Sequence, residues 1–353
     1  MEQPLTSIKT PGYRRRRLAA AILARYATKP APTNRPDPIK VVCVSDTHNN
    51  QPDLPSGDIL IHAGDLTENG SFDEVQAGIT WLSSQSHPFK ILIAGNHDVL
   101  FDESFLQKYP ERRYGQSKSK KDLDWGDVIY LQDSTITLDI PVRTTDPTSQ
   151  PPARRVTIHG SPWTPQYGIS AFQYTPLAGP SLLAAQLSHY PDYTPNPPSA
   201  AAAAAAAPGP GSGPTLEILV THGPPKLYLD RRDIHRAGCP YLLCEVARIR
   251  PRLHVFGHIH AAHGREDVVM DGLRQAHDDV VIGWGGWECV AWMVVLVVWE
   301  RVRRVGRALV GGCGGWCGIA TTRRGEGVTT FVNASVVGGR GNEVRNGAVV
   351  IEI

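Results

Sequence analysis

The sequence has few cysteines, and none of them stands in a CxxC pair. Its six cysteines are scattered through 353 residues, a chain far too long for a small secreted scaffold held by disulfides. Cys313 and Cys317 have no histidine nearby to complete a zinc site. These absences disfavour a structural zinc cluster and a disulfide framework, and they favour a reducing intracellular compartment over secretion.

The main part of the chain also lacks a cluster of basic residues. Hydrophobic residues make up 41% and charged residues 20% of the sequence, which is ordinary for a globular protein. The net charge of +2 hides an asymmetry, because residues 1–36 carry eight basic residues against Glu2 alone, and the remainder is net acidic. Since binding to a phosphate backbone needs a clustered basic face, we expect no nucleic-acid polymer as a partner.

The N-terminal residues 1–38 are rich in proline and arginine. We expect a basic, disordered tail here, holding one helix-like piece from Tyr13 to Tyr26. The Arg-rich, acid-poor start resembles an organelle presequence, but its apolar run is interrupted at Arg25 and no small-residue secretory cleavage pattern follows. We therefore expect a cytoplasmic protein, with a mitochondrial or a peripheral-membrane location as the alternatives.

Strands and helices alternate from Ile39 onward, which predicts an α/β fold in one domain over residues 39–353. Apolar runs rich in β-branched residues predict strands, and the spacing of Val75, Ile79 and Leu82 predicts a helix over Asp73–Gln85. Two insertions interrupt the pattern. Residues 176–214 are rich in proline and alanine, with eight alanines at 200–207, and predict disorder. Residues 265–328 hold an apolar and basic helix and a Gly-rich loop.

The apolar run Val290–Trp299 admits three interpretations. Its ten residues are about 15 Å long as a helix, half of a bilayer core, and extending the run upstream takes in Glu288. Arginines follow it at 301, 303, 304 and 307, which is typical of an interfacial helix. The segment 290–310 is therefore buried in the protein or a dimer, attached to a membrane surface, or, least readily, a membrane span.

Chemistry is indicated where polar residues directly follow five apolar strands. The carboxyl ends of strands are where α/β sheets place their ligands. GNHD alone could be a plain turn with a capping Asp, but five such loops indicate a metal site. The residues that follow the strands are Asp46 and His48, Asp65, Asn96 with His97 and Asp98, His222, and His258 with His260.

The ligand types indicate two transition-metal ions. Imidazole and carboxylate without thiolate suit Mn, Fe, Zn or Ni, and we expect Mn first. Seven candidate ligands exceed one tetrahedral ion, so two ions are implied, roughly 3.5–4 Å apart around a shared carboxylate. Such a pair clamps the attacking and leaving oxygens of a phosphoryl displacement.

The ordered series DxH, GD, GNHD, strand-end His and GHxH resembles the calcineurin-like metallophosphoesterase superfamily. The segments IHAGDLT, HGSPWTP, THGPP, HVFGHIH and FVNAS are similar to its branch of small metallophosphoesterase-domain proteins, in a fungal-looking version. The resemblance covers about Ile39–His263 and Thr329–Ile353. It implies the metallo-dependent phosphatase fold, a four-layer α/β sandwich of two mixed β-sheets flanked by helices, to which the last two strands return.

The resemblance also implies a role for each site residue. Asp46, His48 and His260 would hold the first metal ion, and Asn96, His222 and His258 the second. Asp65 would bridge the two ions, and a hydroxide between them would attack phosphorus. His97 would be a proton donor or a transition-state contact for the leaving oxygen, and Asp98 would orient its ring.

The function that follows is a dinuclear metal-dependent phosphoester hydrolase, a phosphodiesterase acting on a small nucleotide or similar ester. A protein Ser/Thr phosphatase is disfavoured, because GDLTENG lacks the arginine of the GDxxDRG motif by which those enzymes hold phosphate. The alternative from another class is a membrane-surface or interaction module that keeps the metal site but turns over little. The pattern leaves open the substrate and the oligomeric state.

Overall fold

The computed structural model describes residues 12–30, 37–141, 153–175, 177–190, 216–232, 235–309, 327–339 and 341–353, with side chains described as far as Arg303 in the last helix. The alanine tract 200–207, Cys313 and Cys317 lie outside the described residues. Internal contacts divide the chain into two units, one formed by Pro32–Val268 and Thr329–Ile353 and a smaller one formed by Met1–Ala31 and Val269–Val328.

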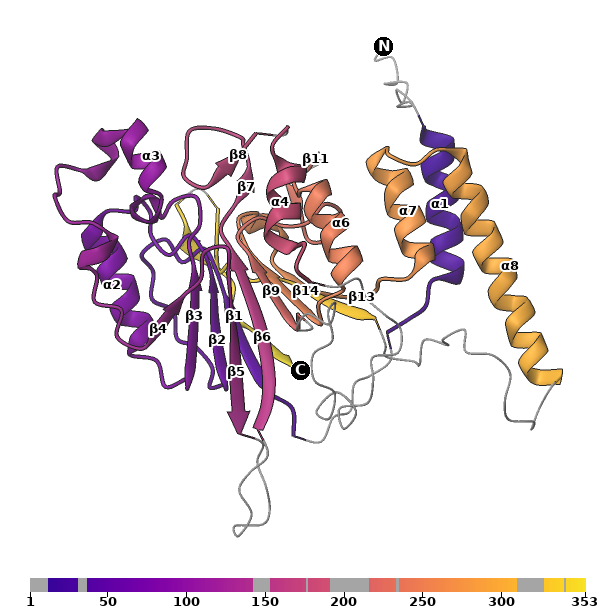
Figure 1. Ribbon diagram of the computed structural model, residues 1–353, viewed down its shortest axis with the longest axis horizontal. Coiled ribbons are helices and arrows are strands. Elements are labelled where there is room, and N and C mark those ends of the chain that lie inside the picture. Colours follow the sequence, from indigo (N-terminus) through magenta and orange to yellow (C-terminus); the bar gives the residue numbers. More distant parts are fainter. Residues whose placement is uncertain are drawn as a thin grey trace, which may run out of the picture. The chain divides into compact units, whose positions relative to one another are not determined.

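The larger unit contains two mixed β-sheets (Figure 1). The first sheet comprises β1 (Lys40–Val44), β2 (Ile59–Ala63), β3 (Phe89–Ile93), β4 (Val128–Tyr130) and β17 (Val349–Glu352), in the order β17-β1-β2-β3-β4. The second comprises β5 (Ser134–Pro141), β6 (Ala153–Ser161), β9 (Ile218–Thr221), β12 (Leu253–Phe256), β13 (Gly264–Val269) and β14 (Val328–Asn333), in the order β13-β14-β12-β9-β6-β5. In the first sheet only β17 pairs antiparallel, against β1; in the second, β5 pairs antiparallel with β6.

Short two-stranded sheets accompany the two large sheets. Within the described residues they are β7 (Thr164–Pro165) with β8 (Gln173–Tyr174), β10 (Arg231–Arg232) with β11 (His235–Arg236), and β15 (Val337–Gly338) with β16 (Glu343–Val344).

The core lies between the two sheets because successive strand residues face opposite sides. On β1, Val41 and Cys43 pack against apolar residues of the second sheet, whereas Val42 and Val44 face the other way. That other face is covered by α2 (Phe72–Ser83), which starts at a capping box between Ser71 and Glu74. All of these strand positions are fully buried, which explains the near-continuous apolar runs in the sequence.

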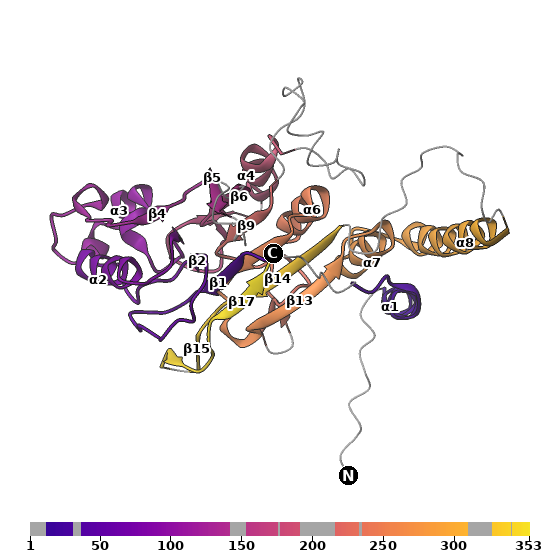
Figure 2. The same cartoon turned by 90° about the horizontal axis from the view of Figure 1, so that it is seen from below.

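Helices flank both sheets. Beside the second sheet, α4 (Gly179–Leu187) and α6 (Pro240–Ile249) contact each other near β6 and β9 (Figures 1 and 2). The short helices α3 (Glu103–Lys108) and η4 (His260–Ala262) follow strand-end loops of the two sheets. Two mixed sheets flanked by helices confirm the predicted α/β sandwich, and β14 and β17 return to it as expected.

The smaller unit is built from three helices, α1 (Tyr13–Tyr26), α7 (Gly272–Ile282) and α8 (Trp287–Leu309), which pack side by side (Figures 1 and 2). Ala19 and Leu23 of α1 are buried against Val280 and Met293. The helix-like piece predicted at Tyr13–Tyr26 is α1, and the apolar partners that fix it lie some 250 residues away in the sequence. The tail over residues 1–38 and the single domain over residues 39–353 stay predictions. Among the described helices, none is both long and apolar enough to cross a membrane.

Candidate metal centre

The structure brings together all seven predicted ligands at the carboxyl ends of five strands. Parallel strands of one sheet end at the same edge, and the loops of the two sheets meet there. The loops follow β1 (Asp46, His48), β2 (Asp65), β3 (Asn96), β9 (His222) and β12 (His258, His260).

These loops contain strained backbone positions. Asp46, His48, Asp65 and His258 all have left-handed backbones, with φ of 53°, 44°, 51° and 68°. Each such residue costs about 1 kcal/mol, which the surrounding packing must offset. Glycine is required next to them at Gly257, where a Cβ atom would lie 2.0 Å from Asp46 Oδ2. The fold therefore holds these side chains in one arrangement at a cost in stability, as functional sites commonly do.

A first cluster is formed by Asp46, His48 and His260, whose nitrogen and oxygen atoms lie within 4.8 Å of one another. Asp46 Oδ1 is 3.2 Å from His260 Nε2, and its carboxylate accepts hydrogen bonds from the His258 backbone N–H at 3.0 Å and from Ser335 Oγ at 2.8 Å. Burial raises the pKa of Asp46, but the His260 hydrogen bond and the neighbouring imidazoles outweigh burial and hold that pKa below its ordinary value. The side chain is a fixed, ionised carboxylate.

A second cluster is formed by Asp65, Asn96, His222 and His258. His222 Nδ1 lies 2.9 Å from the Ala63 carbonyl oxygen, which can only accept, so Nδ1 donates and the neutral ring presents its lone pair at Nε2. That nitrogen faces Asp65 Oδ2 at 3.3 Å and Asn96 Oδ1 at 3.0 Å. When Nε2 carries no proton, three electron-pair donors converge here, an arrangement that fits a cation.

The two histidines differ in their charge state. Burial lowers the pKa of His258 to about 3, so its ring is neutral and can donate a lone pair. Burial also lowers the pKa of His222, but the Asp65 carboxylate reverses the effect and raises it to about 9. The negative charge that attracts a proton to His222 would equally attract a metal ion.

His48 connects the two clusters. It is buried, yet neither of its ring nitrogens makes a hydrogen bond within the described residues. Its Nε2 lies 3.9 Å from Asp65 Oδ2, so Asp65 stands between His48 on one side and His222 on the other. Nδ1 faces the Glu68 carboxylate at 3.1 Å, and metal ligation would satisfy the other buried nitrogen, Nε2. The donor set suits a site for two divalent ions.

His97 lies beside the first cluster, with its ring centroid 4.7 Å from that of His48. Its Nδ1 donates to the Glu68 carbonyl oxygen at 2.7 Å, and its backbone N–H donates to Asp65 Oδ1 at 2.8 Å. Burial alone would lower the pKa of His97. The Asp65 charge and the bond to the Glu68 carbonyl raise it by more than burial lowers it, so the net shift is upward. The ring can hold a proton at its other nitrogen, Nε2.

Asp98 does not orient the His97 ring, and that prediction is wrong. Its carboxylate instead accepts hydrogen bonds from the backbone N–H groups of Leu66, Thr67 and Gly95 and from the Thr67 hydroxyl, at 2.7–3.2 Å. The sharp turn after β3 points the Asp98 side chain into the protein, where it joins the loop after β2 to the loop after β3. Asp98 therefore supports the backbone on which Asp65 and Asn96 stand.

Three further residues at the site were missed by sequence reasoning. Glu68 Oε2 lies 3.1 Å from His48 Nδ1, Ser335 donates to Asp46, and the exposed Tyr167 places its ring centroid 5.0 Å from that of His258. Ser335 follows the strand in FVNAS, so the same strand-end pattern could have identified it. Glu68 and Tyr167 stand in loops without such a signal.

Comparison with known proteins identifies the family to which the chain belongs. A family model for calcineurin-like phosphoesterases matches residues 39–262, well over half of the chain. The chain belongs to this family. It is a metallophosphoesterase in that general sense, and the matched residues include every ligand named above.

Relatives of this calcineurin-like phosphoesterase are found in animals and fungi. The chain is 35% identical over 261 residues to human metallophosphoesterase domain-containing protein 1, covering 69% of this chain and 67% of that protein. It is 33% identical over 242 residues to a UPF0046 protein of Caenorhabditis elegans, covering 66% and 67%. It is 34% identical over 318 residues to the probable rhamnogalacturonate lyase C of Emericella nidulans, covering 89% of this chain but 24% of that protein.

Proposed function

We propose that the protein is a phosphodiesterase that uses two divalent ions, with manganese as the first expectation, to hydrolyse a small phosphodiester such as a nucleotide. The observation that carries the proposal is the position of Asp65 between two adjacent sets of nitrogen and oxygen donors. A shared carboxylate is what a pair of metal ions needs for in-line displacement at phosphorus.

Each residue would contribute binding, orientation or proton transfer. Asp46, His48 and His260 would hold one ion, and Asn96, His222 and His258 the other, with Asp65 between them. When bound, the ions supply Lewis acidity and lower the pKa of the attacking water. Ser335 and the His258 N–H fix the Asp46 carboxylate. The Glu68 carbonyl fixes the His97 ring, so that Nε2 can deliver a proton to the leaving oxygen.

Two observations support a diester over a monoester. Glu68 brings a carboxylate to within 3.1 Å of His48, where it would repel the second negative charge of a phosphomonoester dianion. Asn69 stands where GDxxDRG has its arginine, and its side chain is bound to Glu74 at 3.0 Å, at the start of α2. A singly charged diester needs less positive charge to bind, and this site offers little beyond the ions themselves.

The test is hydrolysis of bis(p-nitrophenyl) phosphate, p-nitrophenyl phosphate and a phosphoserine peptide with Mn, Fe, Zn, Ni or no added metal. We expect turnover of the diester above both monoesters, dependence on metal, and loss of activity in Asp65→Asn and His222→Ala. Matched controls are Asp139→Asn and His189→Ala, which change an exposed aspartate and an exposed histidine away from the site. Metal uptake without turnover of any ester, or full activity in both site variants, would refute the proposal.

A further inference from the structure

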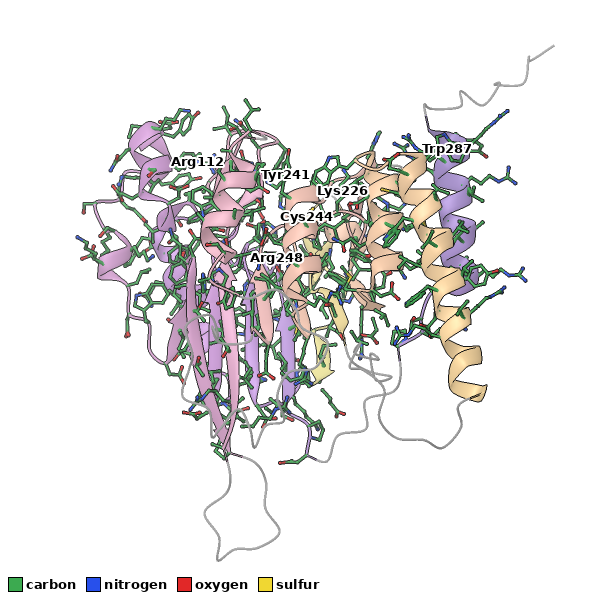
Figure 3. All side chains as sticks on the ribbon, turned by 45° about the vertical axis from the view of Figure 1, so that its right-hand side comes forward. Arg112, Lys226, Tyr241, Cys244, Arg248 and Trp287 are labelled. Atoms are coloured by element: carbon green, nitrogen blue, oxygen red, sulfur yellow. The ribbon has the colours of Figure 1, made fainter. Side chains whose placement is uncertain are left out.

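The helix α8 has a continuous exposed apolar face, here called the α8 outer face. Seven large apolar side chains on it are each 49–58% exposed: Trp287, Trp292, Val294, Val295, Val298, Trp299 and Val302. Their spacing places them on one side of a helix over about four turns. Trp287, labelled in Figure 3, lies at the N-terminal end.

The opposite face of α8 is a normal core face. Val290 and Met293 are 4% and 0% exposed and pack with Ala19 and Leu23 of α1 and Val280 of α7. The helix is therefore fixed by packing within its own unit. About half of each apolar side chain on its outer face is exposed and contributes nothing to that packing, so the exposed apolar surface needs another explanation.

The α8 outer face is larger than a soluble monomer normally exposes in one patch. A tryptophan side chain presents 150–250 Å², so each half-exposed tryptophan contributes roughly 100 Å². Three tryptophans and four half-exposed valines together exceed the few hundred Å² that mark interaction surfaces.

The charge of the unit indicates which partner fits. α1 contains five arginines and no acidic residue, and α8 contains four arginines, all after Trp299, and two glutamates. Arg14, Arg17 and Arg25 of α1 are exposed. Two copies of so basic a unit would repel each other, whereas an anionic surface attracts it.

We propose that the α8 outer face docks on the surface of an anionic lipid bilayer. The tryptophans suit the headgroup level of a bilayer, the valines the acyl boundary beneath it, and the arginines the lipid phosphates. The helix lies in the interface and does not cross the bilayer, in keeping with its charged C-terminal half, since among the described helices none is both long and apolar enough to cross a membrane. The proposal is independent of the proposed hydrolase activity, because none of its residues belongs to the metal centre.

The experiment is co-sedimentation of the full-length protein with two kinds of vesicle. One contains phosphatidylcholine alone, and the other also contains about 30 mol% phosphatidylserine, an anionic lipid of the cytoplasmic leaflet. We expect binding to the anionic vesicles only, weakened by added salt, with a blue shift of tryptophan fluorescence. The double variant Trp292→Glu/Trp299→Glu should bind about tenfold less, since it removes apolar burial and adds negative charge. Val344→Glu, which changes an exposed valine on β16, is the matched control and should bind as the wild type does.

A second variant guards against misfolding of the first. Arg14→Gln/Arg17→Gln changes two exposed side chains of α1, and circular dichroism should remain that of the wild type. It should weaken binding to anionic vesicles and reduce its dependence on salt. Absence of vesicle binding by the wild type would overturn the proposal. A concentration-dependent dimer that Trp292→Glu/Trp299→Glu dissociates, with no vesicle binding, would assign the face to a second copy instead.

Discussion

Glu68 is the residue that we expect to favour diester over monoester substrates. Its carboxylate accepts a hydrogen bond from Asn342 Nδ2 at 2.8 Å, which holds it beside His48. A fixed negative charge next to one metal position repels a dianionic substrate more than a monoanionic one.

Glu68→Gln should therefore raise kcat/KM for p-nitrophenyl phosphate relative to bis(p-nitrophenyl) phosphate, by about tenfold, since 1.4 kcal/mol of repulsion corresponds to that factor. The measurement is the ratio of the two values in wild type and variant. Glu103→Gln, at an exposed position paired with Arg113, is the control and should leave the ratio unchanged. An unchanged ratio in Glu68→Gln would show that Glu68 does not cause the proposed preference for diesters.

The contribution of His97 to the rate should depend on how much the leaving oxygen needs a proton. General acid catalysis contributes about 10²–10⁴-fold when the leaving oxygen is basic. His97→Ala should thus lower kcat by about 10²-fold or more for an alkyl phosphodiester and much less for bis(p-nitrophenyl) phosphate, whose leaving group is already stable as an anion. An equal loss on both substrates, with reduced metal content, would mean that His97 supports the metal site instead.

For single residues, the sequence predicted a place in the candidate site where the residue directly follows a strand. Asp46, Asp65, Asn96, His222 and His258 could be predicted because the strand ends themselves bring such positions together. The direction of a side chain depends on the turn it stands in, and the turn after β3 directs Asp98 toward Thr67 and Gly95. No pattern in the sequence alone reveals that difference.

The turns that follow the strands hold the candidate metal ligands, and the turn at Gly257 approaches a neighbouring loop most closely. A methyl group there would meet Asp46 Oδ2 at 2.0 Å and Ser45 Oγ at 2.1 Å. The loop after β12 lies directly against the loop after β1.

Gly257→Ala should displace the Asp46 carboxylate, lower metal content and diester hydrolysis at least about tenfold, and cost about 1–3 kcal/mol in unfolding free energy. Elemental analysis and denaturant unfolding provide the measurements. At Gly168, where a Cβ atom would meet nothing within 4 Å, the same substitution should have neither effect. Normal metal content in Gly257→Ala would show that this close approach does not fix the ligand.

Element boundaries in the larger unit were predictable, because capping and periodicity are local. The expected helix over Asp73–Gln85 is α2 at Phe72–Ser83, which begins at the Ser71 capping box. The role of α1 was not predictable, because its buried side chains depend on α7 and α8, far along the chain. Local sequence specifies that a helix forms and leaves open where its apolar face packs.

At the scale of the whole molecule, buried neutral histidines make stability depend on pH. Burial lowers the pKa of His254 to about 3 and that of His159 to about 4, from 6.5 in an unfolded chain. Between these values the unfolded chain binds protons that the folded protein does not, so stability falls as pH falls below 6.5.

Each such histidine should remove about 1.4 kcal/mol of unfolding free energy per pH unit between pH 6 and pH 4.5. Urea unfolding at several pH values measures this slope. His254→Gln, which cannot bind the proton, should flatten the slope by about one proton relative to wild type. An identical slope in the variant would mean that His254 is not neutral in the folded protein.

The central claim is that Asp65 joins two metal ions into one hydrolytic centre. Its most direct test is the metal content of purified protein by elemental analysis after loading with Mn, with diester hydrolysis measured on the same samples. We predict about two ions per chain and turnover in the wild type, and at most one ion and no turnover in Asp65→Asn, since the shared carboxylate serves both ions. One ion or none in an active wild type, or two ions with full turnover in Asp65→Asn, would contradict the claim.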